Sequence, residues 1–386
     1  MEGGGLVGAY LFHPVRRGEM ALGAAPIALG LIEGVSGAGS SLASLWSGRR
    51  ADRTRDRRPY LLTGYFATTL KALYAALWFW PWLIVIRTAG WMGRGMRGPM
   101  RDTLIAERVD RQFYGRALGF REAMDTLGAV AGPLLGAGLL AALGYRRLFI
   151  ISAIPGLLSV AAIAVFIRDR DRRYDGAAGA GAGPVEHGAV RLPGRFWRLL
   201  WADGLFSIGN AAPSFFILAV SVGMMHTMGL KGAAALGVAL YAWHNLVYAA
   251  TAVAAGRMAD AAGPRRILIA GYLCLLGALA GFALLPAGIP VFAALFTLTG
   301  LSAGMQESVQ KTYVSLALPA SVRGRGLGLH ASVAGWCGLA SGVLVGGLWS
   351  AGDIAWGFGA AALFVAASLI CLWLFVPEVG TTDPAP

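Results

Sequence analysis

The chain has 386 residues, of which 56% are hydrophobic and only 14% are charged, and its mean hydropathy is +0.61. Soluble domains carry about a quarter of charged residues, so this composition argues against a soluble globular fold. The net charge of +13 does not indicate nucleic-acid binding, because the arginines form short clusters between long apolar stretches.

A helix needs about 20 mostly apolar residues to cross the hydrocarbon core of a bilayer. Eleven stretches meet this length, and we predict a transmembrane helix for each, which makes the chain an all-α membrane protein. The predicted spans are 24–46, 61–80, 82–104, 117–143, 148–167, 197–223, 233–255, 267–286, 290–318, 326–350 and 354–376.

Lysine and arginine are unevenly distributed between alternate loops. One set of loops holds 23 of these residues and the other set holds 5. Loops rich in lysine and arginine stay in the cytoplasm. We therefore expect a multi-pass protein of the cell (inner) membrane with a cytoplasmic C-terminus, whose cytoplasmic loops lie in segments 48–58, 101–116, 168–198, 257–266 and 311–325.

The longest connection joins a charged run to a stretch rich in glycine and alanine, a composition typical of flexible linkers. It divides the chain into two halves. We predict an N-terminal helix bundle over 1–167, a cytoplasmic linker over 168–196, a C-terminal bundle over 197–376 and a cytoplasmic tail over 377–386.

An internal repeat relates the two halves. GRRADRTRDRR begins at Gly48 and GRMADAAGPRR begins at Gly256, 208 residues later, with six of eleven positions identical. GRALG at Gly115 matches GRGLG at Gly324 at an offset of 209, with four of five identical. Two matches at nearly one offset indicate parallel repeats, which in transporters are related by an axis along the membrane normal.

The longer pair of sequences is similar to G-x-L-a-D-R-x-G-R-R, the loop motif between the second and third helices of the major facilitator superfamily. The copies depart from it at Arg50, Arg55 and Ala261. The resemblance implies two pseudo-symmetric helix bundles, alternating access, and a cytoplasmic gate that this motif latches in one state of the cycle. The alternative is a solvated basic loop that only fixes topology. The residues implied in the gate are Gly48, Asp52, Arg53, Arg58, Gly256, Asp260, Arg265 and Arg266.

The same offset leaves the family's first helix incomplete. The counterpart of the span 197–223 would run from before Met1 to about residue 15, by the repeat that parallel bundles imply. We therefore count five spans in the first half and six in the second. We expect that translation starts upstream, and an eleven-helix variant is the alternative.

Ionisable side chains inside spans are candidates for a transport pathway, because a charge at the bilayer centre costs about 2.5–3.5 kcal/mol on insertion scales. Glu33 lies in the middle of a span, away from other charges in the sequence. Arg94 and Arg97 share one helix face, and so do Glu122 and Asp125. These acids and bases can serve a proton relay or substrate recognition, or they can form a structural ion-pair lock.

The matching helices of the second half carry His244, Asn245 and Glu307, so the two halves differ in charge, as a site for an asymmetric ligand requires. A lone histidine in a membrane is nevertheless more often a hydrogen-bonded packing residue. Neither these residues nor any others have the spacing of a metal site or of a catalytic motif.

The stretch from Gly128 to Gly138 resembles the G-x-x-x-G-P-x-x-G-G pattern of drug–proton antiporters. Gly128, Gly132 and Gly136 would allow a close helix contact, and Pro133 would kink the helix by removing a hydrogen bond. This resemblance favours export, whereas a generic tight helix crossing is the alternative.

These features predict a secondary active transporter, not an enzyme, and we favour proton-coupled efflux of a small amphipathic molecule. Asp125 and Glu33 are the first choices for the protonating carboxylates. The alternatives are uptake of a polar metabolite, export of a siderophore or metal, and a transport-inactive sensor or remnant. We expect a monomer in the lipid bilayer, with no cofactor besides the coupling proton and no nucleic-acid partner.

Overall fold

The computed structural model describes residues 26–54, 56–76, 81–167, 191–284, 286 and 288–380. All regular secondary structure in these ranges is helical, as predicted. The N-terminal segment 1–25, most of the predicted linker and the end of the predicted tail lie outside the described residues.

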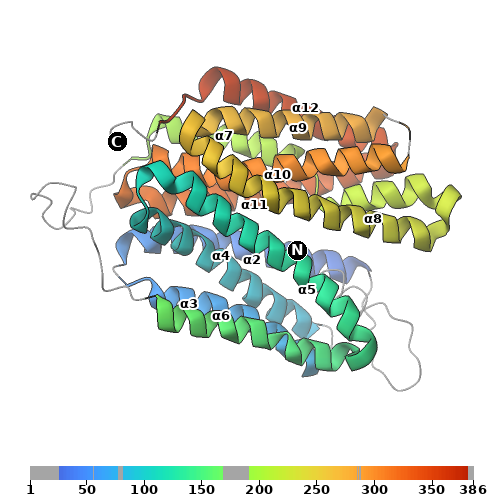
Figure 1. Ribbon diagram of the computed structural model, residues 1–386, viewed down its shortest axis with the longest axis horizontal. Coiled ribbons are helices and arrows are strands. Elements are labelled where there is room, and N and C mark those ends of the chain that lie inside the picture. The colour runs from blue at the N-terminus through green and yellow to red at the C-terminus, as the bar shows by residue number, and fades with distance from the viewer. Residues whose placement is uncertain are drawn as a thin grey trace, which may run out of the picture. The chain divides into compact units, whose positions relative to one another are not determined.

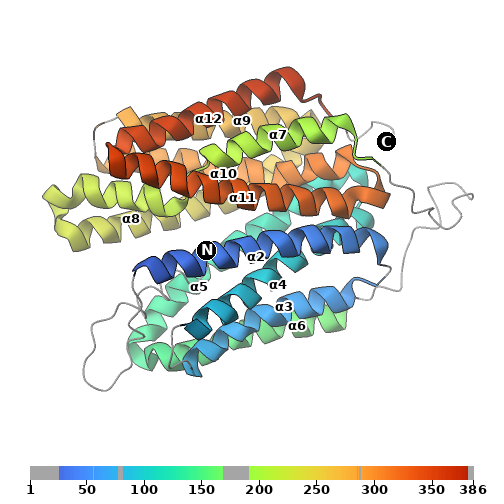
Figure 2. The ribbon, with the colours of Figure 1, turned by 180° about the vertical axis from the view of Figure 1, so that it is seen from behind.

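One compact unit combines Met1–Arg108, Gly132–Pro193 and Pro319–Ser332. Its helix α2 runs beside α4, and α3 runs beside α6 (Figures 1 and 2). A methyl group at Gly95 of α4 would lie 2.1 Å from the carbonyl oxygen of Ser40 in α2, so a small residue is needed for the backbones to approach this closely. The helices are α2 (Pro26–Arg53), α3 (Arg58–Thr69) with a following 3-10 helix (Leu70–Ala76), α4 (Pro81–Arg108) and α6 (Ala153–Phe166).

The second unit combines Val109–Ala131, Gly194–Leu318 and Val333–Pro386. In this unit α10 packs against α8 and α9, and α12 packs against α7 and α9 (Figure 1). Stacked rings of Phe216, Phe282 and Phe358, with centroids 5.0–5.5 Å apart, join three of these helices in its core. The helices are α7 (Gly194–Gly209), α8 (Pro213–Ala262), α9 (Pro264–Leu284), α10 (Ile289–Ala317) and α12 (Ile354–Phe375).

Two further helices contribute to both units. The first part of α5 (Tyr114–Ile151) belongs to the second unit, and its remainder belongs to the first. The first part of α11 (Arg323–Ala351) belongs to the first unit, and its remainder to the second. A short 3-10 turn precedes each helix, Arg111–Phe113 before α5 and Ala320–Val322 before α11, at equivalent places of the internal repeat.

Glycine and proline set the helix breaks. Gly144 in α5 and Gly229 in α8 both have φ of 68°, a value that favours glycine, and they separate spans that were predicted as distinct. The predicted span 197–223 lies within the candidate span Gly194–Gly229, and inside it α7 ends at Gly209 and α8 begins at Pro213. Proline lacks an N–H and holds the preceding Ala212 in an extended conformation, with ψ of 141°.

The predicted spans fall on helices throughout the described ranges. Seven helices in these ranges are long and apolar enough to cross a membrane. The seven are Arg146–Phe166, Gly194–Gly229, Lys231–Ala262, Pro264–Leu284, Ile289–Ala317, Ala320–Ala351 and Ile354–Phe375.

Candidate functional site

The first copy of the loop motif binds the start of α11. Asp52, at the end of α2, accepts hydrogen bonds from the backbone N–H groups of Gly324 (2.7 Å) and Arg325 (2.8 Å). The first N–H groups of a helix have no partner within the helix, and they form its positive end. Burial raises the pKa of the Asp52 carboxyl to about 6, although these two hydrogen bonds and the nearby Arg57 oppose the rise.

The second copy makes the same contact with α5. Asp260, near the end of α8, accepts hydrogen bonds from the backbone N–H groups of Gly115 (2.6 Å) and Arg116 (2.9 Å). Each copy of the long motif therefore caps the helix that begins with the short motif of the other half. The repeat in the sequence corresponds to a pair of reciprocal contacts in the structure.

Glycines allow these helices to meet backbone to backbone. A methyl group at Gly48 would lie 2.4 Å from the carbonyl oxygen of Gly324, and one at Gly328 would lie 2.4 Å from that of Ser44. In the other contact, a methyl group at Gly256 would lie 2.1 Å from the carbonyl oxygen of Gly115. Since real Cβ atoms do not approach other atoms this closely, both contacts require glycine.

The arginines of the motif divide into two groups. Arg58 donates a hydrogen bond to the carbonyl oxygen of Ala164 near the end of α6, and the Nε of Arg265 donates to Leu372 near the end of α12 (3.3 Å). These side chains satisfy carbonyl groups that have no partner within a helix. Arg53 and Arg266 have exposed side chains. A residue outside the prediction, Arg57, binds Glu107 with an N–O distance of 2.8 Å.

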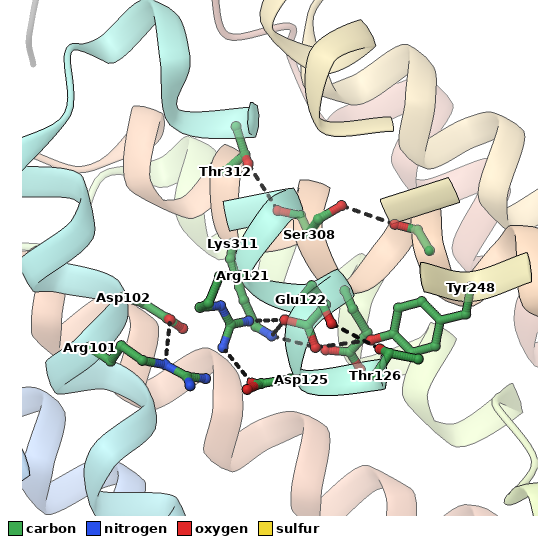
Figure 3. Close-up of polar contacts among 12 residues, drawn as sticks. Arg101, Asp102, Arg121, Glu122, Asp125, Thr126, Tyr248, Ser308, Lys311 and Thr312 are labelled. Atoms are coloured by element: carbon green, nitrogen blue, oxygen red, sulfur yellow. Dashed lines mark hydrogen bonds and ion pairs between the residues drawn. The ribbon is translucent and has the colours of Figure 1, made fainter. Parts of the chain in front are cut away.

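An ion-pair cluster lies on α5, α8 and α10 (Figure 3). The Nζ of Lys311 is 3.0 Å from Glu122 Oε2 and 3.0 Å from Glu307 Oε2. Tyr248 donates a hydrogen bond of 2.9 Å to the other oxygen of Glu122. Glu122 therefore receives donors from both neighbouring helices, and Lys311 joins two of the predicted pathway carboxylates.

Arg121 adds a second cation to the cluster. It binds the adjacent Glu122, and its Nη1 is 3.4 Å from Asp125 Oδ2. The Glu122 side chain is only 11% exposed, whereas those of Asp125 and Glu307 are 43% and 49% exposed. The cluster thus has one enclosed carboxylate and two accessible ones.

Lys311 belongs both to the predicted span 290–318 and to the basic segment 311–325. Helix α10 continues to Ala317, so Lys311 lies inside a helix and its charge faces the cluster. The spacing of four residues between Glu307 and Lys311 could have predicted their ion pair, since residues four apart meet on one helix face. Arg101, which belongs both to the predicted span 82–104 and to the basic segment 101–116, lies inside α4.

The other predicted pathway residues have local partners. Arg94 lies over the ring of Trp91 (5.3 Å to the centroid), and Arg97 lies over that of Tyr65 (4.4 Å). Glu33 belongs to α2, but its side chain lies outside the described residues, as does that of Pro133 in α5.

His244 and Asn245 are both buried in α8. His244 Nδ1 is 2.9 Å from Thr299 Oγ1, and the amide of Asn245 donates to the carbonyl oxygen of Tyr241 (2.8 Å). These contacts are those of hydrogen-bonded packing residues. A polar site that was not predicted surrounds Asp203, which is 2% exposed and accepts from the Tyr272 hydroxyl at 2.5 Å.

The antiporter-like stretch lies in α5. No described atom comes within 4 Å of a methyl group placed at Gly128 or Gly132, and Gly136 is buried. The close contacts of α5 occur earlier in the helix, at Gly115 and Gly119.

Comparison with known proteins identifies the family. The family model "Major Facilitator Superfamily" matches residues 19–243 and 214–386. The chain belongs to the major facilitator superfamily. It is therefore a multi-pass membrane transporter of a small molecule and not an enzyme.

The similarity extends over most of the chain for one relative and over about a third of the chain for another. An uncharacterised MFS-type transporter of Methanocaldococcus jannaschii is 25% identical over 331 residues, which cover 85% of this chain and 81% of the relative. The multidrug resistance protein MdtG of Citrobacter koseri is 28% identical over 125 residues, which cover 32% and 30%. Among solved structures, the E. coli fucose:proton symporter FucP has a TM-score of 0.70 at 15% identity, covering 90% of each chain, and shares the fold.

Proposed function

We propose that this transporter works by alternating access and that the two aspartate contacts form its cytoplasmic gate. The observation that carries this proposal is their reciprocity: Asp52 caps α11 and Asp260 caps α5, through equivalent atoms. A contact between a carboxylate and helix N–H groups can be broken as a unit, because its bonds end on one side chain. Reversible closure of this kind is what a rocking mechanism requires.

We further propose that transport is coupled to protons and that the direction is efflux of a small amphipathic molecule. Carboxylates within predicted spans supply proton acceptors, and Asp125 is one of the two accessible carboxylates next to the enclosed Glu122. Glu33 remains the second choice. Similarity to MdtG over a third of the chain supports export, and no cofactor besides the proton is required.

The proposed setting is the inner membrane of the cell, with the C-terminus in the cytoplasm and a single chain enclosing its own pathway. The excess of lysine and arginine on one set of loops supports this orientation. Both gate contacts involve that set of loops, so the gate would close the cytoplasmic side.

The test uses everted membrane vesicles that contain the full chain and are energised to an acid interior. Cationic, anionic and neutral amphiphiles are added one class at a time, and the pH gradient is followed by fluorescence. Proton antiport predicts that one class collapses the gradient and that Asp125→Asn abolishes the collapse. Asp353→Asn is the matched control, because Asp353 is exposed and its side chain accepts a hydrogen bond from the N–H of Ile354 at the start of α12, which asparagine can also do.

Two outcomes would count against this proposal. If Asp125→Asn and Glu33→Gln both keep full coupled transport, the carboxylate assignment fails. If no class collapses the gradient although the protein is inserted and folded, efflux fails, and uptake of a polar metabolite or export of a siderophore or metal becomes the better reading.

A further inference from the structure

The ion-pair cluster and the α5 gate contact lie along one continuous seam between α5 and α8. On α5, Gly119 meets the carbonyl oxygen of Ala252, where an added methyl group would be 2.3 Å away. Tyr248, one turn earlier on α8, bonds to Glu122. Ala123, Ala249 and Ala252 are buried between the two helices. The seam therefore runs from the Asp260 contact at one end to Glu122 at the other, without an intervening break.

Lys311 joins this seam to α10. Its ammonium group is equally distant from Glu122, which belongs to the seam, and from Glu307, which belongs to its own helix. Glu307 is about half exposed, whereas Glu122 is enclosed. An ammonium group between two carboxylates can shift from one to the other with little loss of charge compensation, because the second partner is already in contact.

Resting on the function proposed above, we propose that Lys311 is a positioning residue that couples proton binding at Glu122 to opening of the α5–α8 seam. When Glu122 takes up a proton, its carboxylate becomes neutral and the Lys311 ammonium, still protonated, passes to Glu307. The bond between α10 and the seam is lost, and the gate contact of Asp260 at its other end is weakened. Loss of the proton restores the ionised Glu122 and draws Lys311 back.

The other charged and titratable groups that face Lys311 and Glu122 are consistent with this exchange. From α5 they are Arg121 and Asp125, and from α8 the group is Tyr248. Arg121 contacts both acids of α5, so it can turn toward Asp125 when Glu122 is neutral. The exchange moves one proton and redistributes two cations among three carboxylates, without transfer of any other group.

The test measures seam opening against pH in the full chain reconstituted in lipid. Hydrogen exchange at the amides of Gly115 and Arg116, corrected with rates for the unfolded chain, reports the Asp260 contact. Because Asp260 is itself titratable, the comparison is made in an Asp260→Asn background, in which the seam should open as pH falls. Lys311→Met removes the cation that competes with the proton, so the midpoint should move up by about one pH unit or more. Lys311→Arg should restore the midpoint of that background.

The decisive comparison is Glu307→Gln, which removes the second carboxylate and leaves Lys311 on Glu122. Its midpoint should move down, opposite to that of Lys311→Met. A merely structural salt bridge would shift neither midpoint, or both in one direction, and either result overturns the proposal. If either result is found while the wild type still transports normally, only the coupling role of Lys311 is refuted. If the wild type shows no proton-linked transport, the proposed function itself is refuted.

Discussion

Replacement of Gly115 by alanine tests whether the two aspartate contacts act as one gate. The added methyl group would lie 2.1 Å from the carbonyl oxygen of Gly256 and 2.7 Å from Asp260 Oδ1. Contacts below 3.0 Å do not persist, so the two backbones must separate by roughly 1 Å. Overpacking of this kind typically costs about 1–3 kcal/mol, which corresponds to about a 5- to 150-fold increase in the open population.

Hydrogen exchange measured by mass spectrometry reports this population. The amides of Gly115 and Arg116 are bonded to Asp260 in the closed contact and should exchange faster in the variant. If the contacts form one gate, the amides of Gly324 and Arg325, which the substitution does not touch, should accelerate as well.

Gly132→Ala is the matched control, because it lies on the same helix and no described atom would be within 4 Å of its methyl group. It should leave exchange at both contacts unchanged. If the amides of Gly115→Ala exchanged at the same rate as those of the wild type, the close approach of the two helices would be refuted. Acceleration at Gly115 without any change at Gly324 would show that the two contacts open independently.

Three further predictions concern the polar anchors. Burial raises the pKa of Asp52 from 3.8 to about 6, so Asp52 binds a proton more tightly in the closed α2–α11 contact than after release. Raising the pH from about 4 to about 6 should therefore weaken the contact. Hydrogen exchange at the amide of Gly324 should show this pH dependence, and Asp52→Asn should remove the dependence. Asp203→Leu leaves the buried hydroxyl of Tyr272 without its acceptor and should cost about 1–3 kcal/mol, seen as a lower midpoint of thermal unfolding in detergent; an unchanged midpoint would contradict the role of this hydrogen bond. Glu378→Gln keeps an acceptor for the N–H of Arg265 but removes the negative charge at the start of α9. The free energy of unfolding should fall by about 0.3–1 kcal/mol in the same assay. A larger fall would mean that the C-terminal segment stabilises the protein by more than this helix cap.

Lys311 shows why part of the site could not be predicted. A lysine near the end of an apolar stretch fits a cytoplasmic loop as well as the last turns of a helix, and the pattern of hydropathy does not distinguish the two. Its partner Glu122 is 189 residues away in the sequence. Only the packing of α5 against α10 brings them within 3.0 Å.

The gate contacts were more accessible to prediction, since the repeat identified the residues of both copies. Which element each aspartate contacts was not evident, because a loop motif carries no information on the helix that it faces. Asp52 meets α11 and Asp260 meets α5 only because glycines at the crossings let the helix backbones touch.

The sequence by itself determined the membrane environment, the helical class, the family and the internal repeat. The membrane environment and the helical class depend on composition and local periodicity, which stretches of about 20 apolar residues reveal. The repeat depends on motif residues that recur at an offset of 208 or 209, and the family was inferred from the resemblance of that motif. The tertiary structure decided the partners: the helix that each aspartate caps, the break between α7 and α8, and the position of Lys311 between two carboxylates. Such contacts join residues far apart in the chain, and their distances follow from how helices pack rather than from local preference.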